Sequence, residues 1–373
     1  MQKDFFGDRL RQLRLINDKS LQNVGDAIAT TKQYIQQLET GLQKPSDFML
    51  QVLADYFHVN TRFFTSVYNK IQEEECFFRK VKSTPTNIKE KAESYTSLFE
   101  EYIRFLDEEE FDLPQSLFLK NKVDYKKLNR EDIDKLADDF RKNCGLDDET
   151  PIENMTKVLE NSGAIVTYFN DLSEKVDAFS INRTRPIIVR NDKKDNGCRL
   201  RFDLAHECGH LVLHDENDSD DEIEEQANNF ASSLLLPRKG FFKEFYELFT
   251  SKNINWRKLI ELKLRWKVSC AAIIHRAYDL NIIDTVRYRS AYIYLRKTGQ
   301  TKKEWGDEKI EIENSSLLQD MTCELINNSV DDIICFLEQK GWSIDLFEKI
   351  LPFDISKLRE KMAQSENIIH LRF

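Results

Sequence analysis

Glycine and proline are scarce in this chain, with 11 Gly and 7 Pro among 373 residues, whereas an average protein carries roughly 12% of the two together. This scarcity argues against turn-dense β-sandwiches and low-complexity chains, and it favours a mostly helical protein. No stretch approaches the ~18 consecutive apolar residues that a membrane span requires, and the first residues lack the apolar segment of a signal peptide. We therefore expect no membrane partner and a cytoplasmic location.

The sequence also lacks paired cysteines and an excess of positive charge. Its seven cysteines are scattered and form no C-x-x-C pair, which argues against a zinc ribbon or redox motif and indicates free thiols. The net charge of −10 argues against a chain that binds nucleic acid over its whole surface, but it leaves room for a local basic face. The length predicts two or three folded units at about 150 residues each.

Apolar residues recur every three or four positions across residues 1–66 and predict a compact set of short helices. One helix fits residues 21–28 with Ser20 as its N-cap, and a second fits 31–40 after a short turn. The second helix of such a pair can enter the major groove of DNA, where glutamine amides pair with adenine. The alternative is a helical scaffold with a solvated polar face. The candidate DNA-binding residues are Thr31, Lys32, Gln33, Gln36 and Gln37.

Three stretches within residues 9–57 add to this signal: R-L-R-Q-L-R, S-L-Q-N-V-G-D-A-I and T-K-Q-Y-I-Q-Q-L-E-T-G-L-Q-K-P. With the small residue Ala29 in the turn, they resemble the XRE or phage-repressor family of helix-turn-helix proteins. The resemblance implies sequence-specific binding to double-stranded DNA, usually by a homodimer on a palindromic site.

The rest of the chain predicts three further units. Residues 67–125 are charged and helical, with one long helix at about 88–109, and are expected to act as a connector. Helices at 131–144, 150–162, 197–214 and 221–236, with β-like runs at 164–168 and 186–189, indicate a mixed α and β segment at 126–297. A helical region of unknown role fills 298–373. We therefore expect a mainly α, multi-domain protein divided at 1–66, 67–125, 126–297 and 298–373.

The sharpest motif is His206-Glu207-Cys208-Gly209-His210, an HExxH within a predicted helix. Two imidazoles four residues apart lie on one face of a helix, so both can bind a single Zn²⁺ ion. Glu207 is the candidate general base, because a carboxylate beside a zinc-activated water can take its proton during amide hydrolysis. The alternative is a chance match in an acidic chain.

A third metal ligand is expected from the helix that follows. Glu224 is the first choice because Asn228, four residues later, shares its face and can accept a hydrogen bond from a ligand imidazole. Glu225 and then Glu222 are the alternatives. His214 is expected outside the ligand set, as a helix-end cation or a core residue.

Other features near this motif have competing interpretations. The acidic run at 215–225 lacks the spacing of a calcium loop and predicts a solvated loop instead. Cys208 is expected to be a small core residue, with an oxidation-sensitive thiol as the alternative. An oxyanion donor could be His275, Arg276 or Tyr278, but a buried core or ion-pair role is favoured for each.

The HExxH lies in a longer pattern, R-L-R-F-D-L-A-H-E-C-G-H-L-V-L-H, followed by E-x-x-A-N-x-F-A-S-S-L-L-L-P. Together with the flanking sequence segments 151–154, 186–189 and 266–269, this pattern makes residues 130–295 resemble the ImmA/IrrE-type metallopeptidases. The resemblance implies a zincin-like α+β domain in which His206, His210 and Glu224 hold Zn²⁺ and Glu207 is the base.

This resemblance also implies a function: cleavage of a transcriptional repressor or antitoxin-like protein, which switches gene expression under stress. The chain departs from the family at Cys208, where a bulkier aliphatic residue is common, and at Gln226, where an acid is frequent. One alternative is a non-proteolytic DNA-binding regulator whose metallopeptidase-like domain senses a ligand or binds a partner. Another is a helix-turn-helix that docks on the substrate's own helix-turn-helix and no longer touches DNA.

Overall fold

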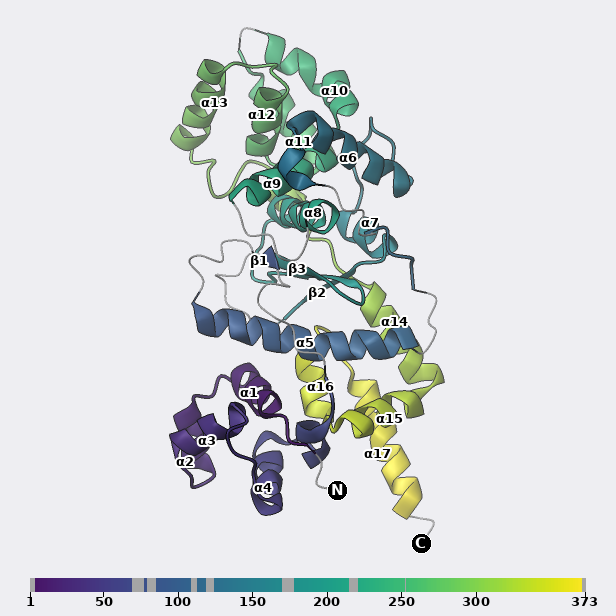
Figure 1. Cartoon of the computed structure of the whole chain (residues 1–373). Helices are drawn as coiled ribbons and strands as arrows, with labels where there is room; N and C mark the ends of the chain where they lie inside the picture. The colour runs from purple at the N-terminus through teal and green to yellow at the C-terminus, as the bar shows by residue number, and fades with distance from the viewer. Residues whose placement is uncertain are drawn as a thin grey trace.

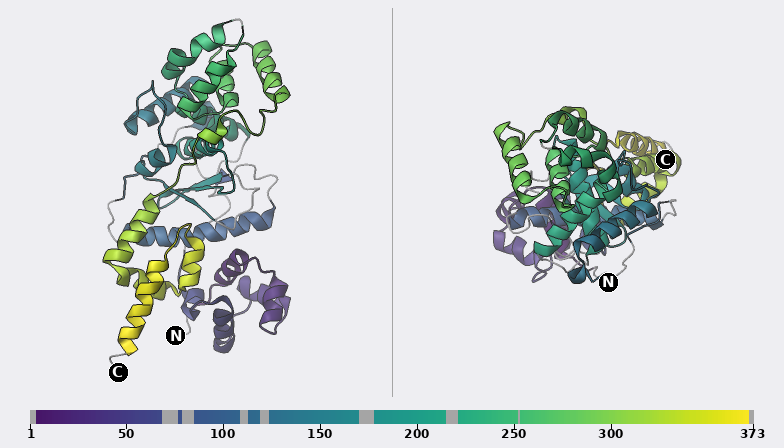
Figure 2. Two further views of the ribbon diagram at one scale, coloured as in Figure 1. Left: turned by 180° about the vertical axis from the view of Figure 1, so that it is seen from behind. Right: turned by 90° about the horizontal axis from the view of Figure 1, so that it is seen from above.

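The structure is a computed structural model that describes residues 4–68, 77–78, 85–108, 113–118, 124–169, 178–214, 221–251 and 253–370. It is mainly helical, with one small sheet near the middle of the molecule (Figure 1). The helix-turn-helix and the last helix lie at one end, and the helices within residues 238–297 lie at the other (Figure 2). The expected fold class is confirmed, while the unit boundaries after residues 66, 125 and 297 stay predictions.

The N-terminal unit is a bundle of short helices. Ser20 begins its second helix by accepting a hydrogen bond from the Asn23 amide (3.0 Å), and Thr31 begins its third helix through the Tyr34 amide (3.2 Å). Between these two helices Ala29 has a φ of 54°, a left-handed conformation that suits a small residue better than a bulky one. The predicted helix-turn-helix is therefore confirmed in both helices and in the turn. The elements are α1 (Gly7–Ile16), α2 (Leu21–Ala27), α3 (Lys32–Glu39), α4 (Asp47–Phe57) and the 3₁₀ helix η1 (Thr61–Thr65).

Helix α5 (Thr86–Glu108) crosses the middle of the molecule and is buried along most of its length. In Figure 1 the helix-turn-helix and the C-terminal helices lie on one side of α5, and the sheet lies on the other. Tyr102 near its C-terminal end contacts the Phe347 ring, with centroids 4.8 Å apart, and its hydroxyl is 2.8 Å from that of Thr322. The helix predicted at 88–109 is present, but the rest of the fold packs on it from both sides.

The sheet has the strand order β1-β3-β4-β2. Strands β1 and β3, and β3 and β4, pair antiparallel, whereas β2 and β4 pair parallel. The strands predicted at 164–168 and 186–189 are β2 and β4, while β3 was not predicted. Its side chains alternate between the two faces of the sheet, so Phe179 and Ile181 join the core beside α5 while Ser180 faces the other way. The bounds are β1 (Phe77–Phe78), β2 (Ile165–Tyr168), β3 (Ala178–Asn182) and β4 (Pro186–Arg190).

Eight helices within residues 130–297 of the described chain share a hydrophobic core with one face of the sheet. One prediction is too long: the helix expected at 150–162 begins at Met155, because Asn154 caps it by accepting from the Lys157 amide (2.9 Å) and Pro151 disfavours a helical residue before it. The helices are α6 (Arg130–Asn143), α7 (Met155–Asn161), α8 (Gly197–Leu213), α9 (Asp221–Leu235), α10 (Arg238–Thr250), α11 (Trp256–Trp266), α12 (Cys270–Asp279) and α13 (Thr285–Lys297), with the 3₁₀ helix η4 (Tyr125–Lys127) before α6.

The C-terminal region returns along α14 to the side of α5 that faces the helix-turn-helix. It contains η5 (Asp307–Lys309), α14 (Leu317–Asn328), α15 (Val330–Lys340), α16 (Ile344–Ile350) and α17 (Ser356–His370). One hydrophobic core joins these helices to the helix-turn-helix, α5 and one face of the sheet, and a second core joins the other face to helices α6–α13. Within the described ranges, none of the helices combines the length and apolar character that a membrane crossing demands.

Candidate metal centre and helix-turn-helix surface

Helix α8, which carries the HExxH, lies close against α9, and Gly209 is the residue that permits this approach. A Cβ at this position would lie 3.1 Å from the Cα of Ala227 and 3.2 Å from the Cβ of Phe230. Both contacts are tighter than nine in ten that real Cβ atoms make, so a larger residue would push the neighbouring helix outward. The glycine inside the motif therefore sets how near a carboxylate on α9 comes to the two histidines.

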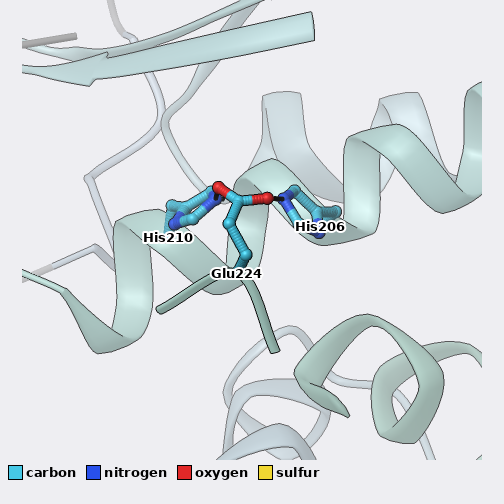
Figure 3. Close-up of side chains that lie close together, drawn as sticks. All are labelled: His206, His210 and Glu224. Atoms are coloured by element: carbon cyan, nitrogen blue, oxygen red, sulfur yellow. Dashed lines mark hydrogen bonds and ion pairs between the residues drawn. The ribbon is translucent and has the colours of Figure 1, made fainter. Parts of the chain in front are cut away.

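His206, His210 and Glu224 converge at one point (Figure 3). The Nε2 atoms of the two imidazoles are 3.0 Å apart, and the Glu224 carboxylate directs Oε2 to His206 (3.5 Å) and Oε1 to His210 (3.3 Å). All the potential ligand atoms lie within 4.8 Å of one another. The two imidazoles are buried, whereas the Glu224 side chain is 40% exposed, so solvent reaches the group on the Glu224 side.

Asn228, on the same helix as Glu224, contacts the ring nitrogen of His206 that faces away from His210 and Glu224. Its amide oxygen is 3.0 Å from His206 Nδ1, and because an amide oxygen only accepts, Nδ1 carries the proton. The lone pair of Nε2 then faces His210 and Glu224. This is the relation that a metal-binding histidine has to its supporting hydrogen-bond acceptor.

The charge of Glu224 suits a ligand. Burial alone would raise its pKa, but when the imidazoles are protonated on Nε2 as well as Nδ1, their hydrogen bonds and positive charge outweigh burial and hold the pKa below the ordinary value. Glu224 is therefore a carboxylate at neutral pH. Two imidazole nitrogens and one carboxylate form a donor set that catalytic Zn²⁺ sites use, with a further coordination position left for water or substrate. The residues present thus fit a zinc ion.

Glu207, the neighbour of His206 on α8, is fully buried. The hydroxyl of Ser180 donates to its Oε2 at 2.7 Å, and Ser180 is itself buried on β3. A short hydrogen bond from a hydroxyl to a carboxylate orients that carboxylate. The sequence did not reveal Ser180, because its strand was not predicted.

The alternatives to Glu224 lie apart from this group. Glu225 and Glu222 are exposed on α9, and an oxygen of Glu222 is 3.5 Å from the amide nitrogen of Gln226. His214 is also outside the group, buried at the end of α8 with Nδ1 3.1 Å from His210 Nδ1 and Nε2 3.1 Å from Gln226 Oε1. The sequence singled out Gln226 only as a departure from the resembled family, without a contact for it.

The three residues considered as oxyanion donors, His275, Arg276 and Tyr278, contact residues outside the metal-binding group. Arg276 is buried and donates to Asp134 (2.9 Å) and to a backbone carbonyl, which agrees with an ion-pair role. Nδ1 of His275 lies 3.0 Å from the hydroxyl oxygen of Tyr288, and the hydroxyl oxygen of Tyr278 lies 3.4 Å from that of Thr285.

Cys208 is fully buried in the core, and burial raises the pKa of its thiol well above the ordinary value, which disfavours the reactive thiolate. The described cysteines are all free thiols. Cys76 and residues 215–220, most of the acidic run, lie outside the described residues.

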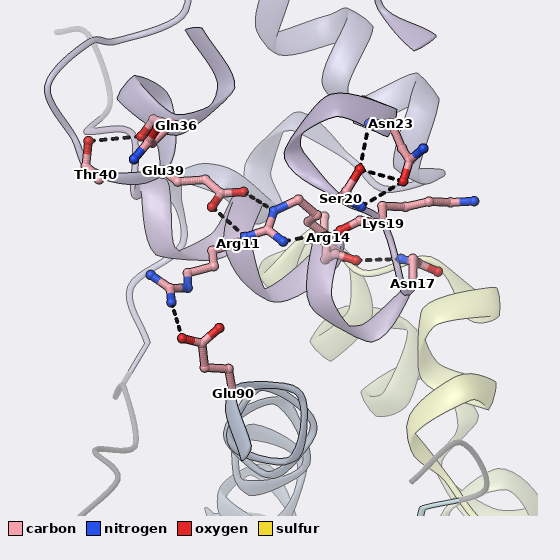
Figure 4. Close-up of polar contacts among 11 residues, drawn as sticks. Arg11, Arg14, Asn17, Lys19, Ser20, Asn23, Gln36, Glu39, Thr40 and Glu90 are labelled. Carbon is pink, nitrogen blue, oxygen red and sulfur yellow. Dashed lines mark hydrogen bonds and ion pairs between the residues drawn. The ribbon is translucent and has the colours of Figure 1, made fainter. Parts of the chain in front are cut away.

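Helix α3 presents the candidate DNA-binding residues. Thr31, Lys32, Gln33 and Gln36 are exposed and Gln37 is half-buried. The guanidinium of Arg14 on α1 holds Glu39 at the end of α3 with two hydrogen bonds, of 2.6 and 2.8 Å, and also donates to the Lys19 carbonyl (Figure 4). Another α1 residue, Arg11, pairs with Glu90 of α5. Arginines of α1 thus contact both α3 and α5.

An HExxH helix paired with a glutamate on the next helix, beside a small sheet, defines a metallopeptidase-like domain, and here it follows a helix-turn-helix. Comparison with protein families agrees with both assignments. Residues 10–64 match the family described as helix-turn-helix, and residues 159–278 match the IrrE N-terminal-like domain. A comparison with curated proteins found no match. The chain therefore joins an XRE-type helix-turn-helix to an ImmA/IrrE-type domain, as the two resemblances indicated.

Proposed function

We propose that this chain is a zinc-dependent endopeptidase that cleaves a transcriptional repressor or antitoxin-like protein and so switches gene expression under stress. The observation that carries the proposal is the convergence of His206, His210 and Glu224 within 4.8 Å. A donor set of two imidazoles and a carboxylate beside a buried glutamate is that of a hydrolytic zinc site. The match to the IrrE N-terminal-like domain supports the same activity.

The side chains around the group have distinct parts in this proposal. A bound Zn²⁺ would supply Lewis acidity, which polarises a peptide carbonyl and makes water a stronger nucleophile. Glu207 takes the proton of the attacking water and delivers it to the leaving nitrogen. Ser180 holds one oxygen of this carboxylate (2.7 Å), and the surrounding burial keeps bulk water away from it.

We also propose that α3 binds double-stranded DNA through Thr31, Lys32, Gln33, Gln36 and Gln37, with two copies on a palindromic site. The exposure of this face and the helix-turn-helix match support it. Replacing Gln33 and Gln36 by Ala should abolish a gel shift with the upstream DNA of the chain's own gene. The exposed Gln22, which bonds to Asp26 on α2 (2.5 Å), supplies a control, because Gln22→Ala leaves α3 unchanged. A double variant that still binds would place recognition elsewhere.

The decisive experiment measures zinc and cleavage together. The substrate is the repressor encoded beside this chain, and the zinc content of each purified protein is measured by atomic absorption. Glu207→Gln should retain zinc and lose cleavage, while Glu224→Ala should lose both. Glu225→Gln is the matched control, because Glu225 is exposed on the same helix and outside the convergent group.

Two outcomes would contradict the proposal. One is cleavage by Glu207→Gln at the rate of the unmodified chain, and the other is loss of zinc from Glu225→Gln but not from Glu224→Ala. If Glu207→Gln left the biological output unchanged, the protein would instead be a regulator that uses its metallopeptidase-like domain for binding.

A further inference from the structure

A row of buried polar contacts extends from the ring nitrogen of His210 that faces away from Glu224. His210 Nδ1 is 3.1 Å from Nδ1 of His214, and Nε2 of His214 is 3.1 Å from Oε1 of Gln226. The amide nitrogen of Gln226 then donates to the backbone carbonyl of Tyr125 at 2.9 Å. These contacts join α8 and α9 to η4, and both His214 and Gln226 are buried.

The backbone carbonyl of Tyr125, at the end of the row, determines which atom donates in each hydrogen bond. A backbone carbonyl only accepts, so the amide nitrogen of Gln226 points at Tyr125 and its oxygen points at His214. That oxygen also only accepts, so His214 carries a proton on Nε2, and the neutral imidazole then has its lone pair on Nδ1. His210 must then donate from Nδ1. The proton of His210 is thereby placed on Nδ1, and its Nε2 lone pair faces His206 and Glu224.

We propose that His214 and Gln226 are positioning residues for the metal centre, which hold His210 in the tautomer and ring orientation that a zinc ligand needs. Asn228 acts in the same way on His206 with a direct amide contact, whereas His210 is reached through a second imidazole. In the opposite tautomer, His210 would donate its Nε2 proton to the Nε2 lone pair of His206, 3.0 Å away, and its own lone pair would not face the metal. This inference rests on the proposed zinc site.

The proposed role of His214 and Gln226 differs from simple packing, because it requires hydrogen bonds at defined atoms. These atoms are the two ring nitrogens of His214 and the side-chain oxygen of Gln226. A phenylalanine at 214 has a similar shape and still meets the Tyr125 ring, which lies edge-on to His214 with centroids 5.6 Å apart. It has no acceptor for the Nδ1 proton of His210. A leucine at 226 likewise keeps the volume of the side chain but removes the oxygen that directs His214.

Two measurements on the full chain test the inference. Long-range ¹⁵N–¹H correlation spectra of zinc-free, ¹⁵N-histidine-labelled protein, which has six histidines, should show His210 protonated on Nδ1 and His214 on Nε2. Zinc affinity, measured by competition with a chromophoric chelator, should fall about 10–100-fold in His214→Phe and in Gln226→Leu. Tyr125→Phe is the matched control and should bind as the unmodified chain does, because it keeps the backbone carbonyl and the ring.

The outcomes separate this inference from the proposed function. Unchanged affinity in both variants, or a wild-type His210 protonated on Nε2, overturns the role of His214 and Gln226 while zinc binding stands. An unmodified chain that binds no zinc overturns the proposed function and this inference with it. Melting curves of the zinc-free proteins identify a variant that fails to fold, and the other variant then decides.

Discussion

Replacing Arg9 by methionine tests whether a buried ion pair holds the helix-turn-helix on α5. Arg9 is completely buried, and its guanidinium donates to both oxygens of Glu101 at 2.6 and 3.0 Å. It also lies over the rings of Phe63 and Tyr68, 4.8 and 4.3 Å from their centroids. The pair joins α1 to α5, which are separated in the sequence by the whole helix-turn-helix.

The expected cost follows from what the substitution leaves behind. Arg9→Met leaves the Glu101 carboxylate buried without its arginine partner. Removal of one partner of a buried pair lowers the free energy of unfolding by about 3–5 kcal/mol. Within the described part of the chain, Lys340 is a further cation beside Glu101, at 3.8 Å and about one-third exposed, so it offsets about 1 kcal/mol at most. We therefore expect a net loss of roughly 2–4 kcal/mol in the free energy of unfolding.

Urea unfolding followed by far-UV circular dichroism measures this loss as a shift in midpoint. The double variant Arg9→Met with Glu101→Met should recover most of it, because no unpaired charge stays buried. Arg11→Met is the matched control on the same helix, since its pair with Glu90 is 41% and 31% exposed and should contribute less than about 1 kcal/mol. The reasoning is refuted if Arg9→Met costs no more than Arg11→Met, or if the double variant is no more stable than Arg9→Met.

Three further predictions concern the metal centre and the pH dependence of stability. Ser180→Ala removes the hydrogen bond to Glu207 (2.7 Å) and should slow cleavage about 10–100-fold with unchanged zinc content; an unchanged rate would show that Ser180 does not orient the base. Gly209→Val should weaken zinc binding about tenfold or more, although it alters no ligand, because its side chain meets Ala227; equal affinity in chelator competition would contradict this. Burial raises the pKa of Glu160 to about 7 despite two backbone amides that donate to it. The folded state then holds a proton that the unfolded chain releases near pH 4.5, so this group's contribution to stability is lost as the pH rises to about 7. Glu160→Gln should flatten that dependence in urea midpoints taken between pH 5 and 8, and an unaltered slope would argue against a raised pKa.

The neighbours on each helix of the candidate site could be predicted from the sequence, because they depend on helix geometry alone. Positions four residues apart share a face of any α-helix, which placed His206 with His210 and Glu224 with Asn228. The caps of α2 and α3 are equally local, since a side-chain oxygen bonds to an amide three residues away. The strand β3, Ala-Phe-Ser-Ile-Asn, was missed because it has one β-branched residue, whereas the similarly short β2 and β4 have three each. Ser180 was missed with it.

Contacts between segments far apart in the sequence could not be predicted from local patterns. The sequence predicted α5 as a connector, but Tyr102 meets Thr322, 220 positions away, and no periodicity within the helix reports such a partner. The row from His210 through His214 and Gln226 to Tyr125 likewise spans three elements. Local sequence is sufficient to predict which side chains share a helix face, because the regular backbone dihedrals of a helix set that arrangement. Which faces meet, and how closely, was decided by the packing of the whole chain, including the space left at Gly209.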